Sequence, residues 1–379
     1  MELQTIKQHL TPFYLYDTEL LKKTLSIAKK EADHYKYIVH YAMKANSNDR
    51  IMELIHSMGF GIDSVSGNEI KRALQIGFKA SDITFAGVGK TDDEIKLGIE
   101  KEVFSFNVES IPELEIINTM AIRLGKIASI ALRINPNIDA NTHSYITTGT
   151  EENKFGINIW EMDEIFELLP KFIGVKLIGL HFHIGSQITD MNVFKNLCLR
   201  VNQIQEIFIA NQIIVENINV GGGLGINYHE PDLEPIADFK SYFAVFKRFL
   251  DLRPNQKLHF ELGRSLVAPC GNLISKVLYI KKGAAKQFAI IDASMTDLLR
   301  PALYQSFHYI NALYNVSAKT EKYDVVGPVC ESTDIFRKAV DLPKLQRGDY
   351  IAIRSVGAYG QVMSSNYNLR DKAGEIYVD

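Results

Sequence analysis

The sequence predicts an α/β fold in which a TIM-type (β/α)8 barrel is followed by a second, mostly β domain. Its first 270 residues contain about eight short β-rich runs with amphipathic stretches between them, which is typical of parallel strands covered by helices. After residue 270, β-rich runs continue without regular helices, which indicates a separate sheet. A length of 379 residues is about twice that of one ordinary domain and accommodates both parts.

Each barrel strand is expected at an apolar run that precedes a helical stretch. Stretches such as DRIMELIHSM and IKRALQIGF place apolar residues three and four positions apart, as helices that cover a sheet do. Successive βα units in this number favour a closed barrel over an open sheet. The expected strands cover residues 37–43, 60–65, 82–87, 103–108, 127–134, 175–184, 213–220 and 257–262.

The second domain is expected to be a β-sandwich or β-barrel. The segment TPFYLYD, residues 11–17, precedes the first barrel unit and is expected to join this sheet. We therefore expect residues 20–270 to form the barrel, and residues 1–19 together with 271–379 to form the β domain. The β-rich runs that suggest this domain cover residues 272–282, 287–293, 322–329, 348–356 and 375–379.

Composition and charge point to a small-molecule substrate. Lys and Arg number 42 against 45 Asp and Glu, and no basic block indicates nucleic acid or an anionic membrane as a partner. No stretch approaches the roughly 18 apolar residues of a membrane span, and the start lacks a signal-peptide pattern, so a cytoplasmic location is expected. Cys198, Cys270 and Cys330 are odd in number and widely spaced, which favours free thiols over disulfides.

Polar side chains stand where the expected barrel strands end. Active sites of such barrels lie at the carboxyl ends of the strands, so these side chains are candidates for one site. The alternative is that each is an ordinary polar residue of an exposed loop. The candidates are Lys44, Asp63, Ser66, Asn107, Arg133, Asn135, His181, His183, Gly221 to Gly223, Glu261 and Arg264.

Lys44, in YAMKANSN, directly follows an apolar strand. We expect its stem to be buried and its amine to lie in a cavity, where desolvation lowers the pKa and favours a Schiff base. The alternative is a solvated lysine on the rim. Glycine-containing loops follow two later strands, at residues 185–186 and 221–223, and their amides could hold a phosphate or simply form tight turns.

The strand alternation in HFHIGS sends His181 and His183 to the same face. They could ligate a metal together with His259 and Glu261, or His183 could instead stack on an aromatic cofactor. A glycine-rich phosphate loop has no place in metal-hydrolase chemistry, so we expect no metal. If the cofactor is pyridoxal phosphate, the Glu261 carboxylate would keep the ring nitrogen protonated, which favours decarboxylation; the alternative is an interior glutamate paired with Arg264.

Six short motifs occur in a fixed order: YAMKANSN, HFHIGSQ, NVGGGLG, ELGRS, GPVCESTD and GAYG. By these motifs the chain resembles the fold-type III pyridoxal-phosphate-dependent decarboxylases, which have an alanine racemase-like barrel. Residues 134–157 and 292–304 resemble the branch that acts on diaminopimelate more than the ornithine or arginine branches. The resemblance extends from residue 11 to 370, and one departure is Leu262, where the family usually has proline.

The resemblance implies pyridoxal 5'-phosphate as the cofactor and decarboxylation of meso-2,6-diaminopimelate to L-lysine and CO2, a step of lysine biosynthesis. It implies that Lys44 forms the Schiff base, His183 stacks on the ring, Glu261 meets the ring nitrogen and Cys330 protonates the product. In this family the Cys-Glu pair comes from the neighbouring subunit, which implies a homodimer with shared active sites. The implied cofactor ligands also include Ser186, Gly221, Gly222, Gly223, Gly263, Arg264 and Tyr359, and the implied substrate ligands are Arg264, Arg300, Tyr304, Glu331 and Tyr359.

Other functions stay open on the residues alone. A sibling decarboxylase could act on carboxynorspermidine or on a carrier-bound amino acid. A non-catalytic pyridoxal-phosphate carrier or a metal hydrolase would belong to a different class. Carriers resemble the barrel alone, so the β domain with Cys330 and Glu331 argues against a carrier.

Overall fold

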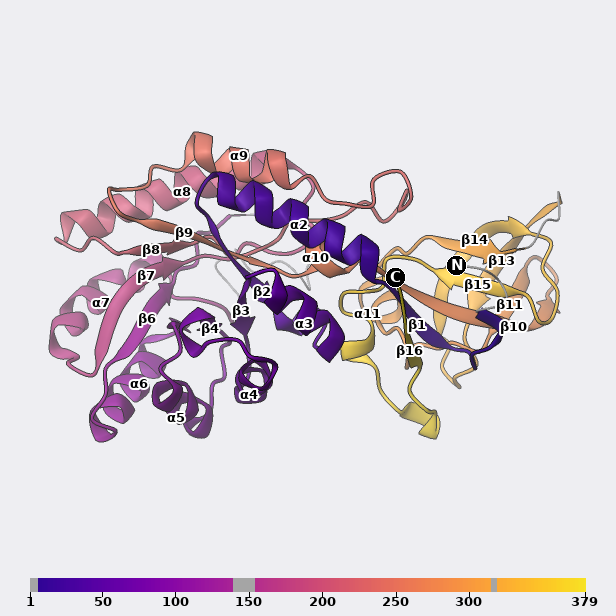
Figure 1. Ribbon diagram of the computed structural model, residues 1–379, viewed down its shortest axis with the longest axis horizontal. Coiled ribbons are helices and arrows are strands. Elements are labelled where there is room, and N and C mark those ends of the chain that lie inside the picture. The colour runs from indigo at the N-terminus through magenta and orange to yellow at the C-terminus, as the bar shows by residue number, and fades with distance from the viewer. Residues whose placement is uncertain (1–5, 139–153, 315–318) are drawn as a thin grey trace. The chain divides into compact units, whose positions relative to one another are not determined.

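The computed structural model describes residues 6–138, 154–314 and 319–379, which group into two compact units (Figure 1). The barrel unit comprises Leu25–Gly225 and Asp238–Gly263. The sheet unit comprises Met1–Thr24, Ile226–Ala237 and Arg264–Asp379. The domain limits at residues 20 and 270 stay a prediction. Most of the diaminopimelate-like stretch 134–157 lies outside the described residues.

Eight parallel strands of the barrel unit close into a ring, which confirms the predicted (β/α)8 barrel. The ring closes where β9 pairs with β2, so that His40 lies opposite Glu261. Helices surround these strands in Figure 1. The strands are β2 (Ile38–Ala42), β3 (Gly61–Ser64), β4 (Ile83–Phe85), β5 (Ser105–Val108), β6 (Ala128–Arg133), β7 (Val175–His181), β8 (Asn217–Asn219) and β9 (Lys257–Leu262).

The barrel helices begin and end at residues suited to helix termini. The Ser66 side chain accepts the N–H of Glu69 at the start of α4, and Gly77 ends that helix with φ +116°. No helix in the described part of the chain is long and apolar enough to cross a lipid bilayer. The helices are α2 (Thr18–His34), α3 (Asp49–Ser57), α4 (Gly67–Ile76), α5 (Asp92–Lys101), α6 (Ile111–Arg123), α7 (Met162–Leu168), α8 (Met191–Ala210) and α9 (Phe239–Phe249), with short α10 (Arg264–Val267) and α11 (Arg300–Tyr304) in the sheet unit.

Aromatic side chains of α9 attach this helix to the outside of the barrel. Phe239, Tyr242, Phe243 and Phe246 recur at helical spacing and are buried. The last three lie with ring centroids 4.9 to 5.6 Å from Phe260 of β9. Outward residues of β9 such as Phe260 therefore pack on the helix layer, while the alternate residues of this strand face the barrel interior.

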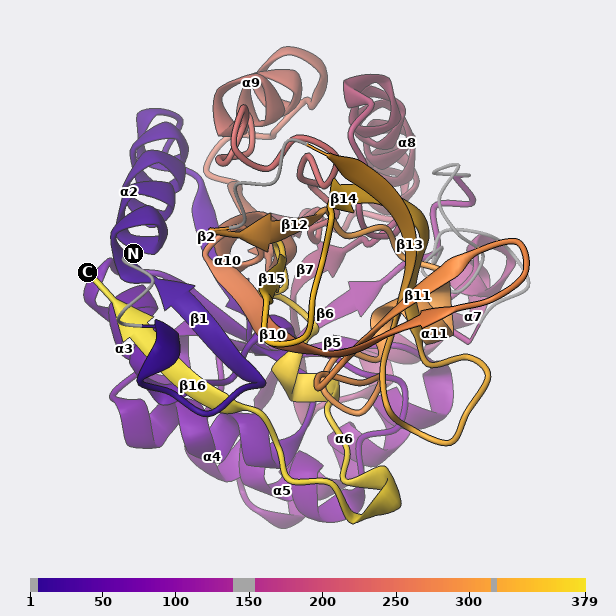
Figure 2. The ribbon, with the colours of Figure 1, turned by 90° about the vertical axis from the view of Figure 1, so that its right-hand side faces the viewer.

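The sheet unit is built on an eight-stranded sheet. As predicted, the segment 11–17 joins it: β1 pairs antiparallel with β10 and parallel with β16. Figure 2 shows β1 beside β16. The strands are β1 (Phe13–Asp17), β10 (Gly271–Lys282), β11 (Gln287–Ile291), β12 (Ile310–Leu313), β13 (Thr320–Val326), β14 (Ile335–Pro343), β15 (Tyr350–Ile353) and β16 (Gly374–Val378).

Two strands of this sheet, β12 and β14, were not predicted. They stand at opposite ends of the strand order β12-β15-β10-β11-β13-β14. β12 has only four residues. In β14 the charged side chains of Lys338 and Asp341 are exposed, and buried positions do not alternate regularly. Short strands and charged side chains are common at sheet edges because they discourage pairing with other chains, and they also remove the apolar alternation that predicts a strand.

Candidate active site

Lys44 lies in a 3-10 turn, Met43–Ala45, that directly follows β2. Its Nζ is 3.3 Å from Oδ2 of Asp63 on β3. The Lys44 side chain is 41% exposed, whereas that of Asp63 is fully buried. The expected desolvation of the amine is therefore not found, because the turn buries Met43 and Ala45 and leaves Lys44 between them on the barrel rim.

Asp63 is an acid whose charge changes near neutral pH. Burial raises its pKa to about 7, the negative charge of Glu261 adds to this, and the Lys44 amine opposes it. The second carboxylate oxygen, Oδ1, is buried and has no hydrogen-bond partner among the described residues. The protonation of the Asp63 carboxylate therefore depends on the charges of Glu261 and Lys44.

Glu261 stands in the barrel interior on β9, and both of its oxygens accept hydrogen bonds. Oε1 accepts from Nδ2 of Asn107 at 3.0 Å and of Asn219 at 2.8 Å, and Oε2 lies 2.9 Å from Nε2 of His181. Burial favours a raised pKa, but His181 and the charge of Lys44 outweigh it and hold the Glu261 pKa below its usual range. Glu261 is therefore an ionised carboxylate inside the barrel.

His183 follows β7 and presents an uncharged imidazole. Its Nδ1 lies 3.2 Å from the amide nitrogen of Gly222, which donates to it, so the ring proton belongs on Nε2. Burial and then the charges of Arg133 and Lys44 hold the pKa of His183 well below its usual value. A neutral, flat ring of this kind suits stacking on another aromatic ring.

The glycine loop after β8 packs directly on neighbouring backbone. A Cβ added at Gly222 would lie 2.0 Å from the carbonyl oxygen of Glu261, and one at Gly221 would lie 2.4 Å from that of Phe182. Gly221 and Gly223 also have φ of +67° and +109°, which favour glycine. The Gly221 amide donates to Oδ1 of Asn219 at 2.9 Å. This loop is a close-packed cradle that larger residues would fill.

The donor set of the barrel unit fits pyridoxal phosphate. It provides a lysine amine, an ionised carboxylate and a neutral imidazole, and His181 and then the charge of Lys44 hold the pKa of Glu261 low. These groups match what the cofactor requires: an amine for its carbonyl, a partner for its ring nitrogen and a flat neighbour. The glycine loop supplies a cradle of the kind that holds phosphate. Of the other predicted ligands in this unit, Ser186 is half-buried after β7 and Gly263 is buried directly after β9.

The four side chains considered as metal ligands do not converge. Nδ1 of His259 lies 2.9 Å from Nε2 of His40, and Nε2 of His259 lies 3.0 Å from Oδ1 of Asn217. Within residues 6–138, 154–314 and 319–379, no three His, Cys, Asp or Glu side chains are placed to hold one ion. His181 instead holds the Glu261 carboxylate.

Four of the predicted ligands in the sheet unit form a group with Tyr228, a residue that the sequence analysis did not name. Its hydroxyl oxygen accepts from Nη1 of Arg264 at 2.7 Å and from Nη1 of Arg300 at 3.2 Å. The Arg264 guanidinium lies 4.9 Å from the ring centroid of Tyr359. Burial favours a lowered Arg264 pKa, but Tyr228, Tyr359 and then Tyr304 outweigh it and raise the pKa. Four predicted residues of the sheet unit thus form one group.

Cys330 and Glu331 lie in the loop between β13 and β14, and both are exposed. The Cys330 amide donates to Oδ1 of Asn368 at 3.3 Å, and the Tyr367 hydroxyl donates to Glu331 at 2.7 Å. The other cysteines are buried, and burial raises the pKa of the Cys198 thiol to about 12. Cys330 is the accessible thiol of the three.

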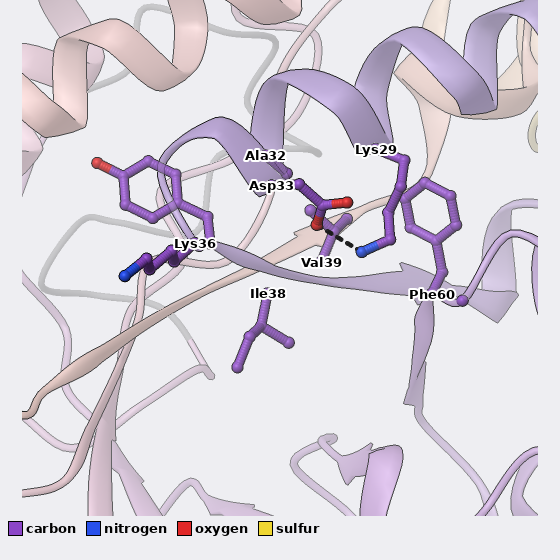
Figure 3. A pocket seen from close by; sticks show the side chains of 9 residues that line it. Lys29, Ala32, Asp33, Lys36, Ile38, Val39 and Phe60 are labelled. Carbon is purple, nitrogen blue, oxygen red and sulfur yellow. Dashed lines mark hydrogen bonds and ion pairs between the residues drawn. The ribbon is translucent and has the colours of Figure 1, made fainter.

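A cavity of about 290 Å³ lies at the opposite end of the barrel strands from Lys44 (Figure 3). It is lined by Ile38 at the start of β2, by Phe60 just before β3, and by Lys29, which is 2.6 Å from Asp33 on α2. The amino-terminal face of such barrels contributes stability rather than catalysis. The carboxyl-end rim with Lys44 remains the candidate active site.

Sequence reasoning named Asp63, Asn107 and His181 among the partners that support the site, but it missed Asn219 and Tyr228. Asn219 could have been predicted from the sequence, because it alternates with Asn217 on the inner face of β8 and stands shortly before the glycines. Tyr228 could not, since its role depends on arginines that are 36 and 72 residues away in the chain.

Comparison with known proteins places this geometry in a family. Residues 18–268 match the family described as "Pyridoxal-dependent decarboxylase, pyridoxal binding domain". The diaminopimelate decarboxylase of Bacteroides thetaiotaomicron is 56% identical over 364 residues, covering 95% of this chain and 94% of that protein. The Helicobacter pylori enzyme of the same name is 42% identical over 97% of this chain and 90% of its own length.

Solved structures agree with the sequence relatives. The crystal structure of diaminopimelate decarboxylase from Helicobacter pylori complexed with L-lysine has a TM-score of 0.93 at 42% identity, covering 99% of this chain and 93% of that one. The enzyme from M. jannaschii in co-complex with L-lysine has a TM-score of 0.90 at 34% identity, covering 99% and 88%. The chain belongs to the pyridoxal-dependent decarboxylases and, within them, to the diaminopimelate decarboxylases.

Proposed function

We propose that this enzyme decarboxylates meso-2,6-diaminopimelate to L-lysine and CO2 with pyridoxal 5'-phosphate as its cofactor. The observation that carries the proposal is one group of barrel residues. Lys44 lies beside Asp63, Glu261 is ionised and His183 is neutral, and the charge of Lys44 contributes to the lowered pKa of both Glu261 and His183. The names of its relatives and the lysine bound in two similar crystal structures support the substrate and product.

The barrel residues bind the cofactor and control protons on it. When bound, pyridoxal phosphate supplies an electron-accepting ring that stabilises the negative charge left on carbon as CO2 departs. Lys44 would hold the cofactor covalently through its amine. Glu261, held ionised by His181, would keep the ring nitrogen protonated, and the His183 imidazole would pack against the ring face.

The phosphate group would be held by the glycine loop and its neighbours. The amides of Gly221 and Gly222 donate to Asn219 and His183, so we propose that these two glycines shape the cradle while Gly223 offers its amide. The further proposed phosphate ligands are Ser186, Gly263, Arg264 and Tyr359.

Residues of the sheet unit are proposed to bind the substrate. Arg264, Arg300, Tyr304 and Tyr359 would hold carboxylate, and Glu331 would hold the distal amine. The far end of diaminopimelate carries a carboxylate beside an amine, and opposite charges on Arg300 and Glu331 match this pair. A substrate without the distal carboxylate would leave a buried arginine unpaired, so we expect such a substrate to be decarboxylated more slowly.

The final proton transfer is proposed to come from a second subunit. Cys330 would donate its Sγ proton to the carbon that has lost CO2, and with Glu331 it would serve the site of the neighbouring chain in a homodimer. The exposure of both residues on the single chain supports this arrangement. The cytoplasmic location stays a prediction.

A substrate panel tests the function. The purified enzyme with cofactor is expected to release CO2 from meso-diaminopimelate and to form L-lysine, with little turnover of ornithine, arginine or carboxynorspermidine. CO2 release from carboxynorspermidine but not from meso-diaminopimelate would identify a sibling decarboxylase. Bound cofactor without CO2 from any amino acid would identify a carrier, and bound metal without a visible absorption band would identify a hydrolase.

Lys44→Ala tests the attachment point. We expect loss of both the visible absorption band and the activity, with the fold retained, because this lysine supplies a covalent bond and not core packing. The matched control is Lys36→Ala at the opposite end of the barrel, which should keep both. A visible band that persists in the Lys44 variant would remove this residue from the mechanism.

A further inference from the structure

Arg300 is held from two sides by groups that carry no negative charge of their own. One is the Tyr228 hydroxyl, whose oxygen accepts from Nη1 at 3.2 Å. The other is His308, whose Nε2 lies 3.0 Å from the same Nη1. All three residues are buried in the sheet unit, and no Asp or Glu of its described residues forms an ion pair with Arg300.

The role of His308 follows from its other ring nitrogen. Nδ1 lies 2.9 Å from the backbone carbonyl oxygen of Arg354, which can only accept, so Nδ1 carries the proton. Nε2 of the neutral ring then offers a lone pair to Arg300. Burial, together with the charge of Arg300, lowers the His308 pKa to about 3, so the ring stays neutral near pH 7.

The Tyr228 oxygen joins two guanidinium groups. It also accepts from Nη1 of Arg264 at 2.7 Å, and the two arginines are 5% and 6% exposed. Burial favours a raised Tyr228 pKa, but the charges of Arg264 and Arg300 outweigh it and lower the pKa. The phenol oxygen thus offsets part of the repulsion between two buried cations and fixes where both lie.

These contacts determine which edge of Arg300 is available. Nη1 has two hydrogens, and the acceptors on Tyr228 and His308 account for both. The Nε hydrogen and one Nη2 hydrogen form a parallel pair that matches the two oxygens of a carboxylate. No described residue accepts a hydrogen bond from either of these atoms.

We propose that Tyr228 and His308 are positioning residues that hold Arg300 with its Nε and Nη2 edge toward a carboxylate of the amino-acid substrate. The inference rests on the proposed function for the identity of that carboxylate. It assigns to each residue a distinct part: His308 orients the guanidinium plane through a neutral lone pair, and Tyr228 joins it to Arg264.

Two diamines that differ only in a carboxylate test the proposal on the holoenzyme. L-lysine carries the carboxylate, and 1,5-diaminopentane lacks it. In Tyr228→Phe and His308→Leu we expect the dissociation constant of L-lysine to rise roughly tenfold, as loss of one oriented pair of charge-assisted hydrogen bonds implies, while that of 1,5-diaminopentane stays unchanged. KM for meso-diaminopimelate should rise in parallel, with kcat changed by less than about threefold, the pattern of lost uniform binding.

Two further variants separate positioning from a merely structural role. His308→Gln keeps an acceptor oxygen within reach of Arg300 and should restore most of the L-lysine affinity that His308→Leu loses. Tyr279→Phe is the matched control, because Tyr279 is an exposed tyrosine whose ring lies 4.8 Å from the Arg347 guanidinium, and it should change neither constant.

Equal weakening of both diamines in Tyr228→Phe and His308→Leu would overturn the proposal, since a general disturbance of the sheet unit does not distinguish them. Equal affinity of the wild-type enzyme for the two compounds would also overturn it. The proposed function fails separately, by an absence of CO2 release from meso-diaminopimelate, because the binding measurements require no turnover.

Discussion

Asp63 is the residue whose charge most directly governs the surroundings of the Lys44 amine. Its carboxylate is fully buried, 3.3 Å from Nζ, and its pKa of about 7 places the change of charge in the working range of most enzymes. Above that pH an ion pair holds the lysine in place, and below it the acid is neutral. The same carboxylate is destabilised by Glu261, so the two acids compete for the positive charge of one lysine.

Asp63→Asn is expected to remove a pH dependence of stability. The folded-state pKa is raised above that of the unfolded chain, so this group contributes stability that is present at low pH and lost as the pH rises toward 7. At most about 4 kcal/mol of unfolding free energy depends on it, for a shift of about three pKa units. Urea unfolding of the cofactor-free protein at pH 5 and pH 8 should show a smaller difference in the variant than in wild type.

The control for Asp63 is Asp341→Asn. Asp341 is exposed and 3.1 Å from Lys322, so it also forms an ion pair with a lysine but without burial. It should leave the difference between pH 5 and pH 8 unchanged, because exposed pairs of this kind contribute little. An Asp63 variant with the full wild-type pH dependence would show that this carboxylate ionises normally in the folded protein.

Glu261→Gln should keep the cofactor and lose most of the activity. The amide cannot stabilise a protonated ring nitrogen by charge, so we expect CO2 release to fall roughly 100-fold or more, as when a preorganised electrostatic group is removed. The visible spectrum reports retention of the cofactor, and a CO2 assay reports the rate. Glu216→Gln, an exposed glutamate 2.8 Å from Lys176, is the control. Normal turnover by the Glu261 variant would rule out its role at the ring nitrogen.

At the scale of elements, the closed barrel brings the site residues together. β2 lies between β3 and β9 in the ring, so Lys44, Asp63 and Glu261 come from three adjacent strands although Lys44 and Glu261 are far apart in the chain. The start of β2, the residues just before β3 and part of α2 line the cavity of Figure 3 instead. Strand direction alone therefore separates the catalytic rim from the stabilising one.

The loop after β8 makes the second element-scale contribution. Gly222→Ala should displace this loop, because the new Cβ would lie 2.0 Å from the carbonyl oxygen of Glu261. This oxygen belongs to the backbone, so a side-chain rearrangement cannot relieve the clash. We expect cofactor affinity to fall at least tenfold and the free energy of unfolding to fall by about 1 to 3 kcal/mol. Cofactor titration and urea unfolding measure the two effects.

Gly89→Ala serves as the matched change for Gly222. No atom lies within 4 Å of a Cβ added at Gly89, so the substitution should leave both quantities as in wild type. If the two variants behaved alike, the close packing of the glycine loop would not matter for the cofactor.

The parts of the fold that sequence reasoning predicted share a strong local pattern. The barrel strands are buried on both faces and read as apolar runs, and the segment 11–17 was placed correctly in the sheet because it precedes the first βα unit. The edge strands β12 and β14 were missed because polar residues interrupt their alternation. Tyr228 and His308 could not be predicted either, since what defines them is three-dimensional contact with Arg300.

At the scale of the whole molecule, the chemistry is expected to require two chains. Lys44 belongs to the barrel unit, and Cys330 is an exposed thiol of the sheet unit. If Cys330 acts in the site of the neighbouring subunit, a two-fold dimer contains two sites, each with Lys44 from one chain and Cys330 from the other. Neither chain then contains a complete site of its own.

Subunit mixing measures this directly. Lys44→Ala and Cys330→Ala should each be nearly inactive alone, yet a heterodimer of the two has one site with both wild-type residues. Random exchange of equal amounts makes about half of the dimers heterodimeric, so the mixture should reach roughly a quarter of wild-type activity. A mixture that stays at the level of its parents, with exchange confirmed by a tagged subunit, would contradict a site shared between subunits and with it the proposed role of Cys330.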